Sequence, residues 1–262
     1  MTSTSADAGG NLAGIGLGAL FAGAEGAVAG AVVGPSVALL LKQAVAQVGG
    51  WITGRQEDRV SEAIRVAATD LEQYLAEGGE IREVFASGQS DAEDIAEGIL
   101  QAVAFSYEQK KAVYLGHMLA SIAIRPDISV ADAHRLTRVV DQLTYRQLVW
   151  LADMGAATAV DPELLSTAAL LIELHQERTV EGVADELKEL SGTYGLIGNL
   201  GAPNEDDLPT GGKPPGRYLA LTVRGRKLFE LLRLDSLPGT DRHTMADELL
   251  STLKAIPPSL RR

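Results

Sequence analysis

Hydrophobic residues recur every three or four positions through most of this chain, with polar residues between them. One such series runs from Val60 to Leu75 and predicts an amphipathic helix over about 56–77 that ends at Gly78 and Gly79. The chain is therefore expected to be mainly α-helical, with a helical bundle in its middle. The same periodicity predicts further helices from about 90, over 130–143, from 144, and over 161–176, 180–190, 223–234 and 244–255.

Several of these helices begin with a pattern that predicts a capping box. In a capping box, a Ser or Thr bonds to the backbone three residues later, and the side chain there bonds back. At Ser106 two outcomes stay open: the helix from 90 restarts there, or it continues with a kink until Pro126. The predicted pairs are Ser90 with Glu93, Ser106 with Gln109, Ser129 with Asp132, and Thr144 with Gln147.

Near the start of the chain, small residues recur at every fourth position. On a helix they would form a smooth ridge, which lets another backbone approach closely, as in GxxxG helices inside membranes. We therefore predict a glycine zipper, a helix-packing ridge that joins copies of the chain into a homo-oligomer. The ridge consists of Gly10, Gly14, Gly18, Ala22, Gly26, Gly30 and Gly34.

The same region has the length of a membrane-spanning helix, since Glu25 is the only charge within residues 12–33. Its eight strongly apolar side chains favour insertion by about 0.3–0.6 kcal/mol each, whereas a central acidic residue opposes insertion by about 3 kcal/mol. Because these terms nearly cancel, we expect conditional insertion by an oligomer that hides Glu25. This residue is then a membrane switch or a pore-facing group; in a soluble form it would face solvent.

Pro35 is expected to act as a hinge between this helix and a second apolar helix over 36–52, giving a helical hairpin. Trp51, Arg55 and Arg59 follow in the order expected of membrane-interface anchors, with their basic flank on the cytoplasmic side. An alternative stays open, in which the hairpin packs within a soluble fold or inside a homo-oligomer.

Towards the other end of the chain, the pattern changes from helical to extended. Short apolar segments at 194–200 and 218–222 flank an acidic loop at 201–216 that is rich in Gly and Pro. These segments predict a small β-hairpin. The second one leads directly into the helix at 223–234.

The second segment also resembles a known motif. The run YLALTVRGRKLFELL is similar to the L-T-x-x-G-x-x-L ending of winged-helix modules, and the similarity extends over about 144–234. It implies a winged-helix-like domain in which 180–190 would be the recognition helix. The matching positions are Leu221, Thr222, Gly225 and Leu228.

A winged helix that binds DNA presents basic or polar residues on its recognition helix. Here that helix is acidic, with Lys188 as its one basic residue. Phosphate would be repelled, so nucleic acid is not the expected partner and a protein contact is favoured. Arg224, Arg226 and Lys227 on the next helix are candidate anion contacts; the other interpretation is a solvated helix face.

A second resemblance lies in the middle of the chain. Residues 110–123, KKAVYLGHMLASIA, are similar to a helix of bacterial abortive-infection proteins of the Abi-alpha type. The resemblance implies a role in phage defence, where membrane damage is a common outcome. Leu119, Ala120 and Ser121 match the pattern, whereas Gly116 and His117 depart from it.

Composition and charge narrow the function further. Of 262 residues, 46% are hydrophobic and 5% aromatic, and the formal net charge of −12 argues against a general phosphate-binding surface. There is no cysteine, which excludes disulfides and thiolate metal sites. The sequence also lacks HExxH, G-x-S-x-G and P-loop motifs. We therefore expect no catalytic, metal-binding or cofactor-binding residues, and a protein that is not an enzyme.

Together these patterns divide the chain into successive parts. The division at 54 follows a sharp change from nearly uncharged to highly charged sequence. The predicted parts are a flexible tail (1–10), the glycine-zipper hairpin (11–54), a helical domain (55–126), a winged-helix-like domain (127–236), and a C-terminal helix with a tail (237–262).

Two functions fit these parts. The first is a non-enzymatic effector at the cytoplasmic face of the inner membrane, or cytoplasmic with conditional membrane association. Its hairpin would oligomerise and insert into or perturb the bilayer, with phage defence as its setting and with membrane lipid and its own copies as partners. The second is a soluble, self-assembling interaction or regulatory protein that uses the winged-helix module to contact protein or DNA. The nearly uncharged residues 12–34 favour the first.

Overall fold

The structure is a computed structural model that describes residues 45, 53–87, 89–156, 182–201, 217–242, 247 and 251. In these residues the chain is mainly α-helical, as predicted, with one pair of short strands. The chain divides into two compact units, Met1–Gln142 and Leu143–Arg262.

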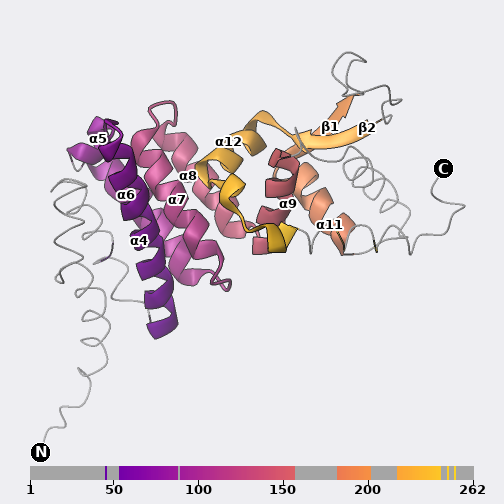
Figure 1. Ribbon diagram of the computed structural model, residues 1–262, viewed down its shortest axis with the longest axis horizontal. Coiled ribbons are helices and arrows are strands. Elements are labelled where there is room, and N and C mark those ends of the chain that lie inside the picture. The colour runs from indigo at the N-terminus through magenta and orange to yellow at the C-terminus, as the bar shows by residue number, and fades with distance from the viewer. Residues whose placement is uncertain are drawn as a thin grey trace, which may run out of the picture. The chain divides into compact units, whose positions relative to one another are not determined.

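The first unit is a bundle of helices (Figure 1). Helix α4 packs most extensively against α7, and α6 contacts α4, α7 and α8. Their apolar faces form a core that includes Leu71, Ile99 and Leu115, which are all buried. The helices are α4 (Gly54–Ala76), α5 (Glu83–Ala86), α6 (Ser90–Phe105), α7 (Lys111–Ile124) and α8 (Val130–Gln142).

Helices α4 and α7 approach each other closely at Gly116. A Cβ atom at this position would lie 2.5 Å from the carbonyl oxygen of Ala63 and 2.9 Å from Cβ of Val66. Real Cβ atoms do not come so near, so only glycine fits without a shift of one helix. The departure of Gly116 from the abortive-infection pattern therefore has a packing reason in this chain.

Two of the predicted capping pairs lie at helix starts as expected, and the Thr144 pair forms the reciprocal box. The backbone N–H of Asp132 donates to Ser129 Oγ over 3.1 Å before α8. At the start of α9 (Tyr145–Ala156), Gln147 N donates to Thr144 Oγ1 over 3.1 Å, and Thr144 N donates to Gln147 Oε1 over 2.9 Å. The predicted starts of α8 and α9 are thus confirmed.

The other two predicted boxes are wrong. If Ser90 were the cap, α6 would begin at Asp91. The helix instead begins at Ser90, because the backbone N–H groups of Ala92 and Glu93 donate to the carbonyl of Gln89. Ser90 is then already helical and cannot cap. At Ser106 the helix does end, but Ser106 Oγ accepts from the N–H of Glu108 over 3.2 Å, and α7 restarts at Lys111.

The second unit combines helices with a small antiparallel hairpin (Figure 1). Ile197 pairs with Leu221 and Gly201 with Arg217, which confirms both predicted strands to within three residues. Helix α9 contacts α11, α12, β2 and η3. The elements after α9 are α11 (Val183–Lys188), η1 (Glu189–Thr193), β1 (Ile197–Gly201), β2 (Arg217–Leu221), α12 (Val223–Leu231) and η3 (Leu234–Ser236).

Several predictions fall outside the described residues. They concern the tail and the hairpin up to residue 52, of which Val45 alone is described, the helix at 161–176, almost all of the loop at 201–216, and most of the helix at 244–255. Among the helices that are described, none has the length and apolar character needed to cross a membrane.

Candidate functional site

The first candidate site is the end of the first unit where the chain arrives from the N-terminal region. Helix α4 begins there at Gly54, and the side chain of Gln56 accepts a hydrogen bond from the backbone N–H of Thr53 over 2.8 Å. Arg55, one of the predicted interface anchors, is exposed in the first turn. The chain thus leaves the apolar region at a well-defined helix start.

Arg59, the second described anchor, binds the neighbouring helix. Its Nε donates to the carbonyl of Val103 over 3.2 Å, and its Nη2 donates to that of Ala104 over 2.7 Å. These carbonyls lie in the last turn of α6, where a cation is stabilised by the helix dipole. Arg59 therefore fastens the start of α4 to the end of α6.

Two aromatic side chains are exposed where α6 ends. Phe105 is 55% exposed and Tyr107 is 101% exposed. In the part of the chain that the structure describes, they and Val223, at 90%, are the exposed large hydrophobic residues. The sequence analysis missed this pair, although two aromatics within three positions are a signal in a chain that is 5% aromatic.

Lys111 at the start of α7 was also missed. It is 3% exposed, and its Nζ donates to the backbone carbonyl of Asp141 over 3.1 Å. Burial lowers the pKa of Lys111, while the nearby charges of Glu108 and Asp141 act in the opposite direction. The lysine thus joins the start of α7 to the end of α8.

His117, which departs from the abortive-infection pattern, is a packing residue between α7 and α4. Its Nδ1 lies 2.6 Å from Oδ2 of Asp70, and both side chains are mostly buried. The ring of Tyr114 lies nearby, with 6.3 Å between the ring centroids. His117 thus joins α7 to α4 within the first unit.

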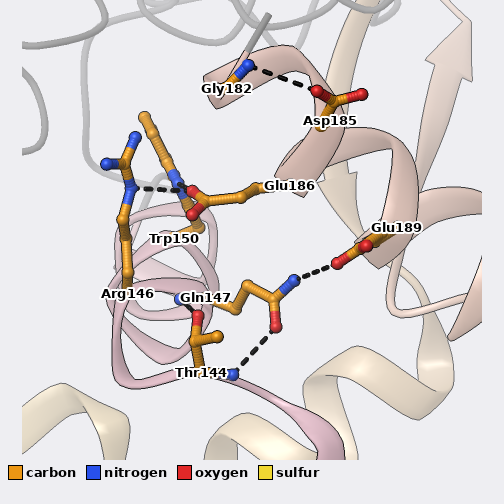
Figure 2. A network of polar contacts seen from close by, with 8 residues as sticks. All are labelled: Thr144, Arg146, Gln147, Trp150, Gly182, Asp185, Glu186 and Glu189. Atoms are coloured by element: carbon orange, nitrogen blue, oxygen red, sulfur yellow. Dashed lines mark hydrogen bonds and ion pairs between the residues drawn. The ribbon is translucent and has the colours of Figure 1, made fainter.

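The second candidate site is a polar network between α9 and the segment α11–η1 (Figure 2). Glu186 Oε2 accepts a hydrogen bond from Trp150 Nε1 over 3.0 Å and lies 2.7 Å from Arg146 Nε. One turn before Trp150 in α9, Gln147 Nε2 donates to Glu189 Oε2 over 2.8 Å. Trp150 and Gln147 are almost fully buried, whereas Arg146 and Glu186 are half-buried and Glu189 is exposed, so the network lies at the edge of the core.

The network explains why the predicted recognition helix is acidic. Glu186 and Glu189 point towards α9 and are bound there, and Asp185 Oδ2 accepts from the backbone N–H of Gly182 over 3.3 Å at the start of α11 (Figure 2). Three of the acidic residues in this helix are thus engaged within the second unit. Asp185 and Glu189 are nevertheless exposed, and Glu186 is half-buried.

The residues of the L-T-x-x-G-x-x-L motif pack α12 against the β1–β2 hairpin and the residues just before it. Thr222 Oγ1 donates to the carbonyl of Gly195 over 2.7 Å and accepts from the N–H of Gly225 over 3.1 Å. A Cβ atom on Gly225 would lie 1.9 Å from the carbonyl oxygen of Leu196, and Leu228 is fully buried. The motif therefore has a structural role in this chain.

The candidate anion contacts on α12 also bind within the unit. Arg224 Nη1 donates to the carbonyl of Tyr194 over 3.1 Å, and Arg226 Nη1 donates to that of Gly155 over 3.0 Å. The guanidinium of Arg226 lies 5.5 Å from the centroid of the Phe229 ring. Lys227 is partly exposed beside them.

The structure does not describe the remaining predicted site residues. The ridge residues, Glu25, Pro35 and Trp51 lie outside the described residues. In the described ranges, no group of three or more His, Asp or Glu side chains could hold a metal ion. Comparisons with protein-family models, with curated proteins and with solved structures found no match to this chain.

Proposed function

We propose that this protein is a non-enzymatic, membrane-associated effector. Its helical first unit holds the glycine-rich hairpin, which oligomerises and conditionally inserts into a bilayer or perturbs it. The observation that carries the proposal is the nearly uncharged stretch at 12–34, in which Glu25 is the one charge. The resemblance of 110–123 to an abortive-infection helix adds phage defence as the setting.

The described residues support this proposal through the place where the hairpin meets the body. Helix α4 begins two residues after the apolar region, and Arg59 fastens its start to the end of α6. A segment attached in this way is held at one end of a packed bundle. Movement of the hairpin into a membrane would therefore bring that end of the bundle to the membrane surface.

The second unit is proposed to be a winged-helix-like module used for protein contact. The order α9, α11, β1, β2, α12 supports this assignment, as does the packing of Thr222 and Gly225 at the start of α12. Arg224 and Arg226 donate to backbone carbonyls, which engages N–H groups that they could otherwise offer to phosphate. A protein partner is therefore favoured over nucleic acid.

A soluble, self-assembling regulatory protein is the second candidate function. The β1–β2 hairpin leads directly into α12. This order favours the second function, because winged-helix modules commonly contact protein or DNA. In that case the glycine ridge would join copies of the chain in solution, and no lipid would be bound.

Substitution of Glu25 tests the membrane proposal on the full chain. Glu25→Leu removes a term of about 3 kcal/mol that opposes insertion, so a larger fraction of the protein should pellet with lipid vesicles and more encapsulated dye should escape. Glu80→Leu makes the same chemical change at an exposed site between α4 and α5 and should leave both readouts unaltered. Equal binding by wild type and Glu25→Leu would contradict insertion of this segment.

A further inference from the structure

We infer that one corner of the first unit rests in the membrane interface, with Phe105 and Tyr107 as its anchors. This aromatic corner comprises the first two turns of α4, the end of α6 and the loop before α7. The inference rests on the proposed function and deepens it, because it states which surface of the body faces the lipid. The ligand is the headgroup region of a bilayer.

The position of the corner is the first argument. Arg59 in α4 donates to the carbonyls of Val103 and Ala104 in α6, so the chain's arrival point at Thr53 and the exposed Phe105 lie at the same end of the bundle. The 52 residues before Thr53 contain the whole apolar hairpin. A hairpin that enters a bilayer thus draws this end of the bundle to the bilayer surface.

The chemistry of the two side chains is the second argument. Exposed large hydrophobic residues are uncommon in the described residues, yet two of them, Phe105 and Tyr107, stand two positions apart here. Tyrosine is enriched at membrane interfaces because its ring enters the apolar boundary while its hydroxyl group stays hydrated. Burial of a phenylalanine ring in the same layer is favourable as well.

The charge of the corner is the third argument. Its basic residues are Arg55, Arg59 and Lys110, and its acidic residues are Glu57, Asp58 and Glu108. The corner is therefore close to neutral in a chain whose formal net charge is −12. Anionic lipid would repel most of the protein surface, but it would not repel this part. Contact here depends on the rings rather than on headgroup charge.

An indole placed in the corner reports directly on its surroundings. The experiment uses the full chain with Trp51→Phe, because the other tryptophan, Trp150, is fully buried and gives a constant background. Tyr107→Trp places an indole in the corner, and Val223→Trp places one at an exposed site in the second unit. Each protein is mixed with vesicles of phosphatidylcholine and phosphatidylglycerol, with and without brominated acyl chains.

We expect the indole at 107 to shift its emission to shorter wavelength and to be quenched by the brominated lipid, whereas the indole at 223 should change little. Vesicle-bound protein whose indole at 107 is not quenched would overturn the inference while leaving the proposed function intact. A blue shift without bromine quenching would mean that a second copy covers the corner, which also overturns it. Wild-type protein that does not bind the vesicles at all would overturn both.

Removal of the rings gives an independent test. The double variant with Phe105→Ser and Tyr107→Ser changes only exposed positions, so its circular dichroism should match that of wild type. Its binding to the same vesicles should fall several-fold, with the remainder due to the hairpin. Unchanged binding would overturn the role of the two rings as anchors.

Discussion

At Gly116, one missing methyl group determines how closely α7 approaches α4. A Cβ atom would lie 2.5 Å from the Ala63 carbonyl oxygen, so one helix must move to accommodate it. We expect Gly116→Ala to lower the free energy of unfolding by about 1–3 kcal/mol, as overpacked cores typically do. Urea denaturation followed by circular dichroism measures this change.

Gly98 provides the matched control for Gly116. It also lies in the middle of a helix, α6, but no heavy atom lies within 4 Å of the Cβ position there. Gly98→Ala should therefore raise the free energy of unfolding by about 0.5–1 kcal/mol through helix propensity alone. Substitutions with effects of the same sign and size at both positions would refute the close approach.

Lys111 should make the stability of the protein depend on alkaline pH. Burial lowers its pKa in the folded state from the usual value of 10.5. Between the folded and unfolded pKa values the unfolded chain binds more protons, so the free energy of unfolding rises with pH in that window. Below the window the cost of burying the charged amine is fully present, and above it the amine is neutral in both states.

Comparison with Lys111→Met isolates this effect, because other titrating groups contribute equally to both proteins. Urea denaturation at several pH values up to about 10.5 should show wild type gaining stability relative to the variant as pH rises. A pH-independent difference for Lys111→Met would show that the lysine is not buried.

At the scale of elements, Glu186 joins α11 to α9. Glu186→Leu would leave the buried Trp150 Nε1 without its acceptor, and we expect a loss of about 1–3 kcal/mol in the free energy of unfolding. Glu186→Gln keeps an acceptor and should cost less. Thermal unfolding monitored by tryptophan fluorescence measures the stability loss of both variants. Lys188→Leu, at an exposed position of the same helix, is the control. Equal losses at 186 and 188 would contradict the network.

Local sequence patterns predicted the elements well where the signal was itself local. Periodicity located most of the helices that the structure describes, and the pairs Ser129 with Asp132 and Thr144 with Gln147 located two helix starts. The Ser90 pair failed because the helix begins one residue earlier, at a carbonyl that no side-chain pattern marks. A capping pattern thus predicts that a helix starts nearby, and packing decides at which residue the helix begins.

Contacts between distant segments could not be predicted in the same way. The bond from Arg59 to Ala104 spans 45 positions and that from Trp150 to Glu186 spans 36. Helical periodicity shows which face of a helix is apolar, but not which helix covers it. For this reason the bonds that Arg59 and Glu186 make to other helices could not be predicted, and Lys111 was missed.

At the scale of the whole molecule, the chain joins a nearly uncharged N-terminal region to a strongly acidic body. The body alone would be repelled by anionic lipid, since the formal net charge of the chain is −12. The membrane association that we propose would then depend on the apolar hairpin, assisted by the near-neutral aromatic corner. The account therefore predicts that the N-terminal region is necessary for lipid binding.

Flotation with lipid vesicles measures whether the N-terminal region is needed for lipid binding. The full chain and a variant that lacks residues 1–54 are mixed with phosphatidylcholine–phosphatidylglycerol vesicles and centrifuged through a density gradient, with circular dichroism as a check that the shortened chain remains helical. We predict that the full chain floats with the vesicles and that the shortened chain stays at the bottom. A full-length protein that remains entirely at the bottom would contradict the account.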